Sequence, residues 1–283
     1  MVNKHKKKRG RDELFSSGHH AERDYYSNPG FKNLAQPSVI WGRHAVIAAL
    51  NNPKRVLSRV LCSKNNRTLL DAEISKIRSK GPCSIPELEV LPIKELNLLV
   101  PSDSLHQGFV MISEALQEPD FDWFLEKNKA TPHLTLVLLD QVTDPQNVGA
   151  IARSSVALGA HGMILQSRNA PKLDGTLAKA ASGATEYIPI FRVTNIARAI
   201  RKMKEFDISC FGLAGEADVS INNTSLTTRL ALVLGAEGSG LRRLTRESCD
   251  QLVSLPTVGH FSTLNVSNAA SIALYELQRR KDA

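Results

Sequence analysis

The sequence predicts an α/β protein with a small N-terminal α/β unit and a larger C-terminal unit built on a mostly parallel sheet. Two observations predict this fold. From residue 38 to the end, short apolar runs alternate with segments of helical spacing. In the C-terminal half the apolar runs are continuous, which indicates strands buried on both faces, as in a parallel sheet covered by helices on each side.

We expect residues 1–37 to form a disordered basic arm, because they are polar, charged and without hydrophobic periodicity. Six cations lie within the first eleven positions: Lys4, Lys6, Lys7, Lys8, Arg9 and Arg11. With the chain's net charge of +8, this cluster favours a polyanionic partner such as RNA. The alternative is a solvated tail that only aids solubility.

The small α/β unit is expected at residues 38–113. Its strands are expected at Val39–Trp41, Val56–Cys62, Glu89–Leu91 and Gly108–Ile112. Its helices are expected at Ala45–Asn51, Thr68–Lys80 and Ile93–Leu99. Residues 114–132 are charged and contain proline, so we interpret them as a linker that carries a short helix at Phe121–Lys127.

The larger unit is expected at residues 133–283. Its strands are expected at Leu134–Leu139, Gly162–Leu165, Ile188–Ile190, Ile208–Leu213, Leu230–Leu234 and Gln251–Leu255. Its helices are expected at Val148–Leu158, Asn195–Lys204, Leu241–Ser248 and Val266–Arg280.

Three of these strands run into polar loops that precede helices. The loops are Asp144–Gly149 (sequence DPQNVG), Gly235–Gly240 (GAEGSG) and Pro256–Asn268. The carboxyl ends of strands are where an open α/β sheet binds its ligands. The second and third loops are also close in the chain, so we expect the loops to build a single site.

The first loop brings Asn147 to the start of a helix, with Arg153 six residues further on. At about 100° per residue the two side chains face within roughly 120° of each other. Asn147 alone could be only a helix cap. Arg153 lies in an otherwise apolar stretch, where an arginine must extend to solvent or meet an anion.

The second loop lets a ligand approach the backbone closely, because glycine has no Cβ. It is neither a Walker A loop, since no Gly-Lys-Ser/Thr follows, nor the GxGxxG of dinucleotide-binding proteins. Arg242 and Arg243 begin the next helix. In the third loop, Ser267 or Asn268 could be the helix cap.

Composition excludes several classes of protein. No run of about 18 apolar residues predicts a membrane span, and the basic N-terminus has no apolar core of a secretory signal. The four cysteines show no metal-binding spacing; they are Cys62, Cys83, Cys210 and Cys249. We therefore expect a cytoplasmic protein with reduced thiols, no membrane contact and no metal site.

On these three loops the chain resembles the SpoU (TrmH-like) 2′-O-ribose RNA methyltransferases of the SPOUT class. The first loop, with Asn147 and Arg153, resembles the first family motif, and Leu234–Leu241 resembles the second. The third motif is matched from Leu255 to Ser267, except that Thr263 stands where the family often has Ser. Asn268 and the basic arm are further departures from the family pattern.

The N-terminal unit is similar to the family's substrate-binding domain, which is L30e-like. Trp41–His44 and His106–Gly108 carry this similarity. The resemblance implies a deep trefoil knot in the C-terminal unit, an exception to the usual absence of knots. It also implies a homodimer that forms through the knot domain. The implied substrate is RNA: the closest likeness is to enzymes that methylate a guanosine of 23S rRNA, and tRNA is the alternative.

The resemblance further implies S-adenosylmethionine as the methyl donor and assigns residues to the site. The expected catalytic residues are Arg153, Asn147, Glu237, Asn265, Thr263 and Ser267. The expected cofactor-binding residues are Leu234, Gly235, Gly238, Leu255 and Leu264. Glu237 either fixes its loop or pairs with Arg153.

Methyl transfer to a ribose hydroxyl is an in-line displacement that needs alignment and removal of a proton, and it needs no metal. The family proposal makes Arg153 the base, although guanidinium holds its proton up to a pKa above about 12. We favour Arg153 as the group that binds the adjacent phosphate and stabilises the developing alkoxide.

Two other functional classes are alternatives to the methyltransferase. A non-enzymatic RNA-binding protein would explain the basic arm and the L30e-like unit, and it predicts no affinity for the cofactor. A dinucleotide-dependent oxidoreductase would need GxGxxG after the first strand of the larger unit, where this chain has DPQNVG.

Overall fold

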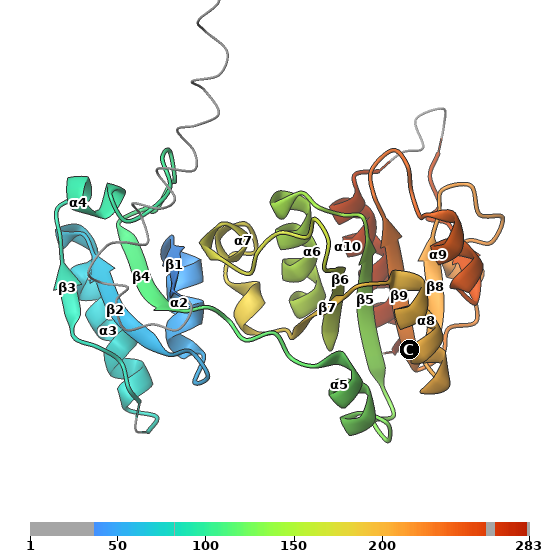
Figure 1. The fold of residues 1–283 in the computed structure, drawn as a ribbon, viewed down its shortest axis with the longest axis horizontal. Helices are drawn as coiled ribbons and strands as arrows, with labels where there is room; N and C mark the ends of the chain where they lie inside the picture. The colour runs from blue at the N-terminus through green and yellow to red at the C-terminus, as the bar shows by residue number, and fades with distance from the viewer. Residues whose placement is uncertain (1–36, 82, 259–263, 282–283) are drawn as a thin grey trace, which may run out of the picture.

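The computed structural model describes residues 37–81, 83–258 and 264–281. Residues 1–36 of the predicted arm and Thr263 therefore lie outside the described residues, whereas Pro37, the last residue of the predicted arm, begins a strand. The chain forms two sheet-based units that lie side by side along the long axis of the molecule (Figure 1). The first unit carries a four-stranded sheet and the second a six-stranded sheet.

The N-terminal sheet has the strand order β1-β4-β2-β3. Strand β4 is antiparallel to both β1 and β2, whereas β3 is parallel to β2. The strands are β1 (Pro37–Trp41), β2 (Leu57–Cys62), β3 (Leu88–Val90) and β4 (Phe109–Glu114). The helices are α2 (Arg43–Asn51), η2 (Lys64–Asn66), α3 (Arg67–Arg78) and α4 (Ile93–Asn97).

Both faces of this sheet are covered. Ile40, Val60 and Met111 pack with α2 and α3, while their neighbours Val39, Leu61 and Val110 pack with Leu96 of α4. This alternation follows from the two-residue period of a strand. The predicted elements of this unit are present, each within three residues of its expected bounds.

The C-terminal sheet has the order β10-β8-β9-β5-β6-β7, and every neighbouring pair is parallel. The predicted mostly parallel sheet is thus confirmed. Its strands are β5 (Leu134–Asp140), β6 (Gly162–Gln166), β7 (Ile190–Val193), β8 (Ser209–Leu213), β9 (Arg229–Gly235) and β10 (Gln251–Val253).

The helices of this unit cover the sheet on both sides. They are α5 (Phe121–Lys127), α6 (Pro145–Ala157), α7 (Gly175–Ala180), α8 (Ile196–Glu205), α9 (Arg243–Ser248) and α10 (Val266–Lys281), with short 3-10 turns η3 (Ala184–Glu186) and η4 (Ile221–Asn223). Val137 and Leu139 of β5 pack with α6, α7 and α10, whereas Leu136 and Leu138 pack with α5 and α8. Burial on both faces explains why the strands are continuous apolar runs.

Several predicted bounds were wrong. The predicted strand Ile188–Ile190 is displaced to β7, and β10 ends at Val253, because Ser254 makes only an isolated bridge to Ser220. Helix α6 begins at Pro145, three residues before the predicted start, since Asp144 caps it. Helix α7 was not predicted.

The strand order reverses between β5 and β9. From β5 the chain adds β6 and β7 on one side, then returns to place β8 and β9 on the other. In open α/β sheets such a switch point opens a crevice at the carboxyl ends of the two strands. The loops after β5 and β9 are the first two predicted loops, so the topology places them together at the centre of the sheet.

The two units meet where α7 and η3 pack against β1 and α2 (Figure 1). Gly175 allows the closest approach, since a Cβ there would lie 2.1 Å from the Val39 carbonyl oxygen. Arg55 and Glu186 form an ion pair across this seam, with Nη2 2.7 Å from Oε1 and side chains only 3% and 0% exposed. Asn52 donates a further hydrogen bond to Glu186.

Candidate functional site

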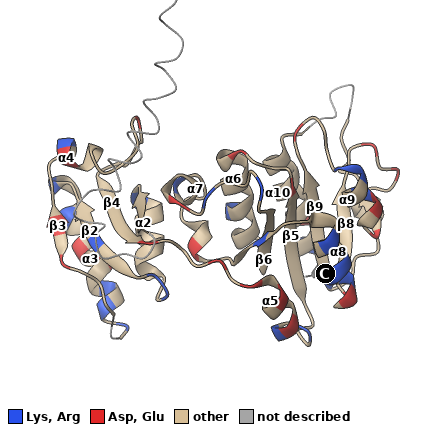
Figure 2. Ribbon diagram, viewed as in Figure 1, with Lys and Arg blue, Asp and Glu red and all other residues tan. Residues whose placement is uncertain are grey.

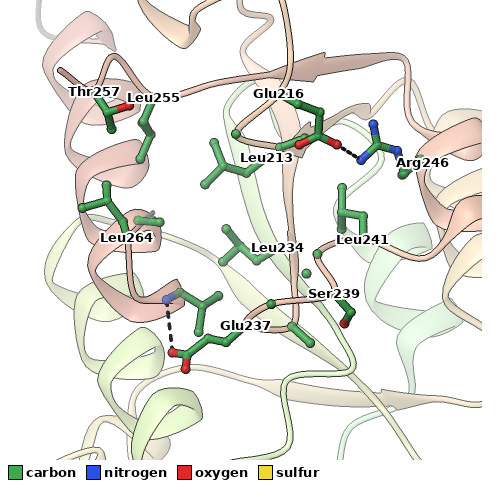
Figure 3. A pocket seen from close by; sticks show the side chains of 18 residues that line it. Leu213, Glu216, Leu234, Glu237, Ser239, Leu241, Arg246, Leu255, Thr257 and Leu264 are labelled. Carbon is green, nitrogen blue, oxygen red and sulfur yellow. Dashed lines mark hydrogen bonds and ion pairs between the residues drawn. The ribbon is translucent and has the colours of Figure 1, made fainter. Parts of the chain in front are cut away.

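Three polar side chains, one from each predicted loop, converge at the switch point. Asn147 of α6 donates from Nδ2 to Glu237 Oε1 at 3.2 Å, and Asn265 Nδ2 donates to Asn147 Oδ1 at 3.0 Å. Asn265 also donates to Glu237. The Val266 N–H lies 3.4 Å from the same carboxylate oxygen, a contact that a dashed line marks at Glu237 in Figure 3. The expectation of a single site built by the three loops is therefore met by this Asn147–Glu237–Asn265 cluster.

Asp144, and not Asn147, caps α6. Its carboxylate accepts from the backbone N–H groups of Gln146 and Asn147, and Pro145 occupies the first helical position, where no N–H is needed. This frees the amide of Asn147 to turn toward Glu237. Asp-Pro before an apolar helix was the signal in the sequence that could have identified the cap.

Asn265 caps α10. Its Oδ1 accepts from the backbone N–H of Ser267 at 2.9 Å and of Asn268 at 3.3 Å, and from the Ser267 hydroxyl at 2.5 Å. The interpretation of Ser267 or Asn268 as the cap was wrong, because these residues donate to the cap. The side-chain amide of Asn265 thus caps α10 through its oxygen and donates a hydrogen bond to Glu237 through its nitrogen.

We expect Asn265→Ala to lower the free energy of unfolding by about 1 kcal/mol, because the first turn of α10 loses its acceptor. Asn195→Ala is the matched control, since Asn195 caps α8 in the same way but contributes no side chain to the loop cluster. Urea denaturation should give similar losses for both variants. An unchanged midpoint for Asn265→Ala would contradict the capping role.

Arg153 lies on the exposed side of α6, about one and two-thirds turns beyond Asn147. It makes no hydrogen bond or ion pair with any residue that the structure describes. Glu237 accepts hydrogen bonds from Asn147 and Asn265 and makes no contact with Arg153 among the described residues. The guanidinium is left available for an anion.

Arg242 and Arg243 are engaged within the protein. Asp140, fully buried at the end of β5, accepts from Arg242 Nε at 2.7 Å and from its backbone N–H at 3.1 Å. Arg243 pairs with Glu247 one turn along α9. Arg242 therefore locks the second loop to the end of β5, a contact across 102 residues that no local pattern signals.

A pocket of about 380 Å³ opens between these loops (Figure 3). All five residues expected to bind the cofactor line it: Leu234, Gly235, Gly238, Leu255 and Leu264. Leu213, Leu241 and Ala269 extend its apolar wall. Glu237 joins the pocket to the asparagine cluster, since it belongs to both.

Glu216 and Arg246 also line the pocket and form an ion pair there. Sequence reasoning missed both residues. Glu216 lies in the loop after β8, which carries no recognisable motif, and Arg246 lies in the middle of a short helix. The only available signal was that β8 ends at the same edge of the sheet as β9.

The pocket does not use a reactive thiol. Burial is the main cause that raises the pKa of both Cys210 and Cys249, in the latter case to about 12. A thiol with such a pKa is protonated at neutral pH and is a poor nucleophile. Neither a three-ligand metal cluster nor a helix long and apolar enough to cross a membrane occurs in the described parts of the chain.

The family model described as "SpoU rRNA Methylase family" matches residues 134–275. This chain belongs to the SpoU family. A second model, "RNA 2'-O ribose methyltransferase substrate binding", matches residues 39–119. The SpoU protein is therefore an RNA ribose methyltransferase, and the resemblance found on the three loops is confirmed.

Two curated relatives are similar over almost their whole length. The 23S rRNA (guanosine-2'-O-)-methyltransferase RlmB of Photorhabdus laumondii is 44% identical over 249 residues, which cover 87% of this chain and 99% of the relative. The protein of the same name from Pectobacterium atrosepticum is 39% identical, with 86% and 98% coverage.

Solved structures share the fold. The SpoU methyltransferase AviRb from Streptomyces viridochromogenes, in complex with AdoMet, superposes with a TM-score of 0.73 and 23% sequence identity. The match covers 94% of this SpoU protein and 98% of AviRb. The similarity therefore extends over both units.

Proposed function

We propose that this protein transfers a methyl group from S-adenosylmethionine to the ribose 2′-hydroxyl of a guanosine in 23S rRNA. The observation that carries the proposal is the Asn147–Glu237–Asn265 cluster, which lies at the edge of the leucine-lined pocket through Glu237. The curated relatives named 23S rRNA (guanosine-2'-O-)-methyltransferase support guanosine in 23S rRNA as the target.

The pocket fits the proposed cofactor. Its apolar wall suits an adenine ring, and the loop from Gly235 to Gly240 exposes backbone that can hydrogen-bond a base. When bound, S-adenosylmethionine supplies an electrophilic methyl group. Leu234, Gly235, Gly238, Leu255 and Leu264 would hold it.

We expect Gly235→Ala to weaken binding of S-adenosylhomocysteine by at least roughly tenfold, because a Cβ at this position would lie 2.2 Å from the backbone carbon of Gly240. The loop would have to move, at a cost of about 1–3 kcal/mol. Gly215→Ala is the control within the same pocket, since a Cβ there meets nothing within 4 Å. Calorimetric titration compares the two variants, and equal affinities would contradict the role of Gly235.

Arg153 is the proposed catalytic residue. Its exposed guanidinium would bind the phosphate next to the target ribose and stabilise the alkoxide that develops as the hydroxyl loses its proton. Arginine does not release its own proton in the accessible pH range, so the proton leaves to another acceptor. Asn147 and Asn265 would orient the ribose and Arg153, while Glu237 and Ser267 would hold the loops through their hydrogen bonds to these asparagines.

For the division of the chain we propose a basic arm at 1–37, an L30e-like RNA-binding domain at 38–113, a linker at 114–132 and the methyltransferase domain at 133–283. We propose that the last of these is threaded as a deep trefoil knot and forms a homodimer. Ile272 and Tyr275 of α10 are 46% and 60% exposed, which supports a partner surface there. We also place the enzyme in the cytoplasm, where ribosomal RNA is exposed.

The cationic surface supports RNA as the substrate. Figure 2 shows Lys and Arg on both units. A partner surface that extends over both units suits a large folded RNA better than a small ligand. Transfer RNA remains the alternative substrate.

The deciding experiment is mapping of 2′-O-methyl sites in rRNA and tRNA from cells with and without the active enzyme. We expect a single guanosine of 23S rRNA to lose its methyl group, and purified protein to restore it on the unmodified RNA with S-adenosylmethionine. Loss of a tRNA site would select the alternative, and loss of no site would contradict the methyltransferase function.

A further inference from the structure

Glu216 lies at the pocket on the side away from the reacting cluster. It follows β8 in the loop Ala214–Glu216, next to the glycine loop of β9. Figure 3 shows Glu216 and Glu237 on opposite sides of the pocket, with Leu213 and Leu234 between them. The two carboxylates therefore face different parts of a ligand that fills this space.

Arg246 of α9 holds the Glu216 carboxylate in place, since Nη1 donates to Oε1. The Glu216 side chain is still 64% exposed. A backbone hydrogen bond at Glu216 and the Arg246 guanidinium lower the pKa of this carboxyl group. At neutral pH it is an anion that accepts hydrogen bonds and donates none.

The chemistry of the ligand decides which part can meet this group. The methyl group must face Arg153 and the asparagine cluster, so the sulfur and the amino-acid chain attached to it belong at the Glu237 end. The nucleoside part then lies toward Glu216. A ribose offers two neighbouring hydroxyl donors to a carboxylate, and open α/β sheets use an acidic residue beside a glycine-rich loop for this purpose.

We propose that Glu216, positioned by Arg246, accepts hydrogen bonds from the ribose hydroxyls of the bound methyl donor and so selects a ribonucleoside cofactor. This inference rests on the proposed cofactor. It assigns Glu216 a binding role and leaves the reacting atoms to the opposite end of the pocket.

Calorimetric titration with four ligands tests the proposal. The ligands are S-adenosylhomocysteine, 5′-methylthioadenosine, which lacks the amino-acid part, and the 2′-deoxy and 3′-deoxy forms of 5′-methylthioadenosine. For the unaltered protein we expect at least one deoxy form to bind roughly tenfold more weakly than 5′-methylthioadenosine. Glu216→Ala should bind both ribose-containing ligands roughly tenfold more weakly and should no longer discriminate against the deoxy forms.

Glu247→Ala is the matched control, because Glu247 also pairs with an arginine of α9 but does not line the pocket. It should bind all four ligands as the unaltered protein does.

The proposal is overturned if Glu216→Ala binds 5′-methylthioadenosine normally, since the carboxylate would then face the amino-acid part. It is also overturned if the variant keeps the penalty against the deoxy forms. Failure of the unaltered protein to bind S-adenosylhomocysteine would instead contradict the proposed function itself.

Discussion

Replacing Arg153 with Ala should slow methyl transfer by about 10²–10³-fold, the usual effect of removing one preorganised group from a developing negative charge. Binding of S-adenosylhomocysteine should stay nearly unchanged, because Arg153 does not line the pocket. The side chain is exposed and has no partner among the described residues, so the fold should lose little stability. Single-turnover kinetics with saturating RNA and titration of the cofactor product measure the two quantities separately.

Arg198→Ala is the matched control for this prediction. Arg198 is an exposed arginine of α8, on the opposite face of the sheet from α6. Its loss removes the same charge from the surface and should alter RNA affinity only slightly. Full methylation by Arg153→Ala would reject the assignment, and Arg153→Lys should recover only part of the rate, because an ammonium group cannot form a bidentate contact with phosphate.

Glu186→Ala should destabilise the protein by about 3–5 kcal/mol, since it leaves the guanidinium of Arg55 buried without its counter-charge. Arg55 keeps a hydrogen bond to the Glu114 carbonyl oxygen at 2.7 Å, which favours the lower end of this range. The Asn52 amide also loses its acceptor. Urea denaturation followed by circular dichroism measures the change.

The Arg59–Glu89 pair provides the comparison. It is also a hydrogen-bonded Arg–Glu ion pair, but its side chains are 28% and 37% exposed. Glu89→Ala should therefore cost about 0–1 kcal/mol, as solvent-accessible pairs do. Equal losses for Glu186→Ala and Glu89→Ala would mean that the seam between the units opens to water in solution.

Periodicity predicted most of the strands and helices because each is decided by its own residues. The continuous apolar runs led directly to the parallel sheet, and the order of the three loops led to the family. Local caps were less well predicted: Asp144 and Asn265 hold α6 and α10, whereas the interpretation of the sequence considered Asn147, Ser267 and Asn268. Several polar residues stand at each helix start, and only the fold decides which of them turns back to the backbone.

The contacts that local patterns did not predict join distant parts of the chain. Arg55 reaches Glu186 across 131 residues, and Arg242 reaches Asp140 across 102. Glu216 lines the pocket because β8 lies next to β9, which the strand order decides and the local sequence does not. Asn147, Glu237 and Asn265 meet in one cluster, as the sequence led us to expect, because their three loops lie at the same edge of the sheet.

The wide sequence separation within the Asn147–Glu237–Asn265 cluster affects how the protein is made. Asn265 contacts Asn147 across 118 residues, so the cluster forms only after α10 has docked on α6. A growing chain that has left the ribosome as far as β10 contains the whole sheet but neither Asn265 nor α10. Such a chain has no complete site, and the apolar residues under α10 stay open to solvent until α10 has been made. We conclude that competence for methyl transfer arises only when α10 docks on the sheet and brings Asn265 to Asn147.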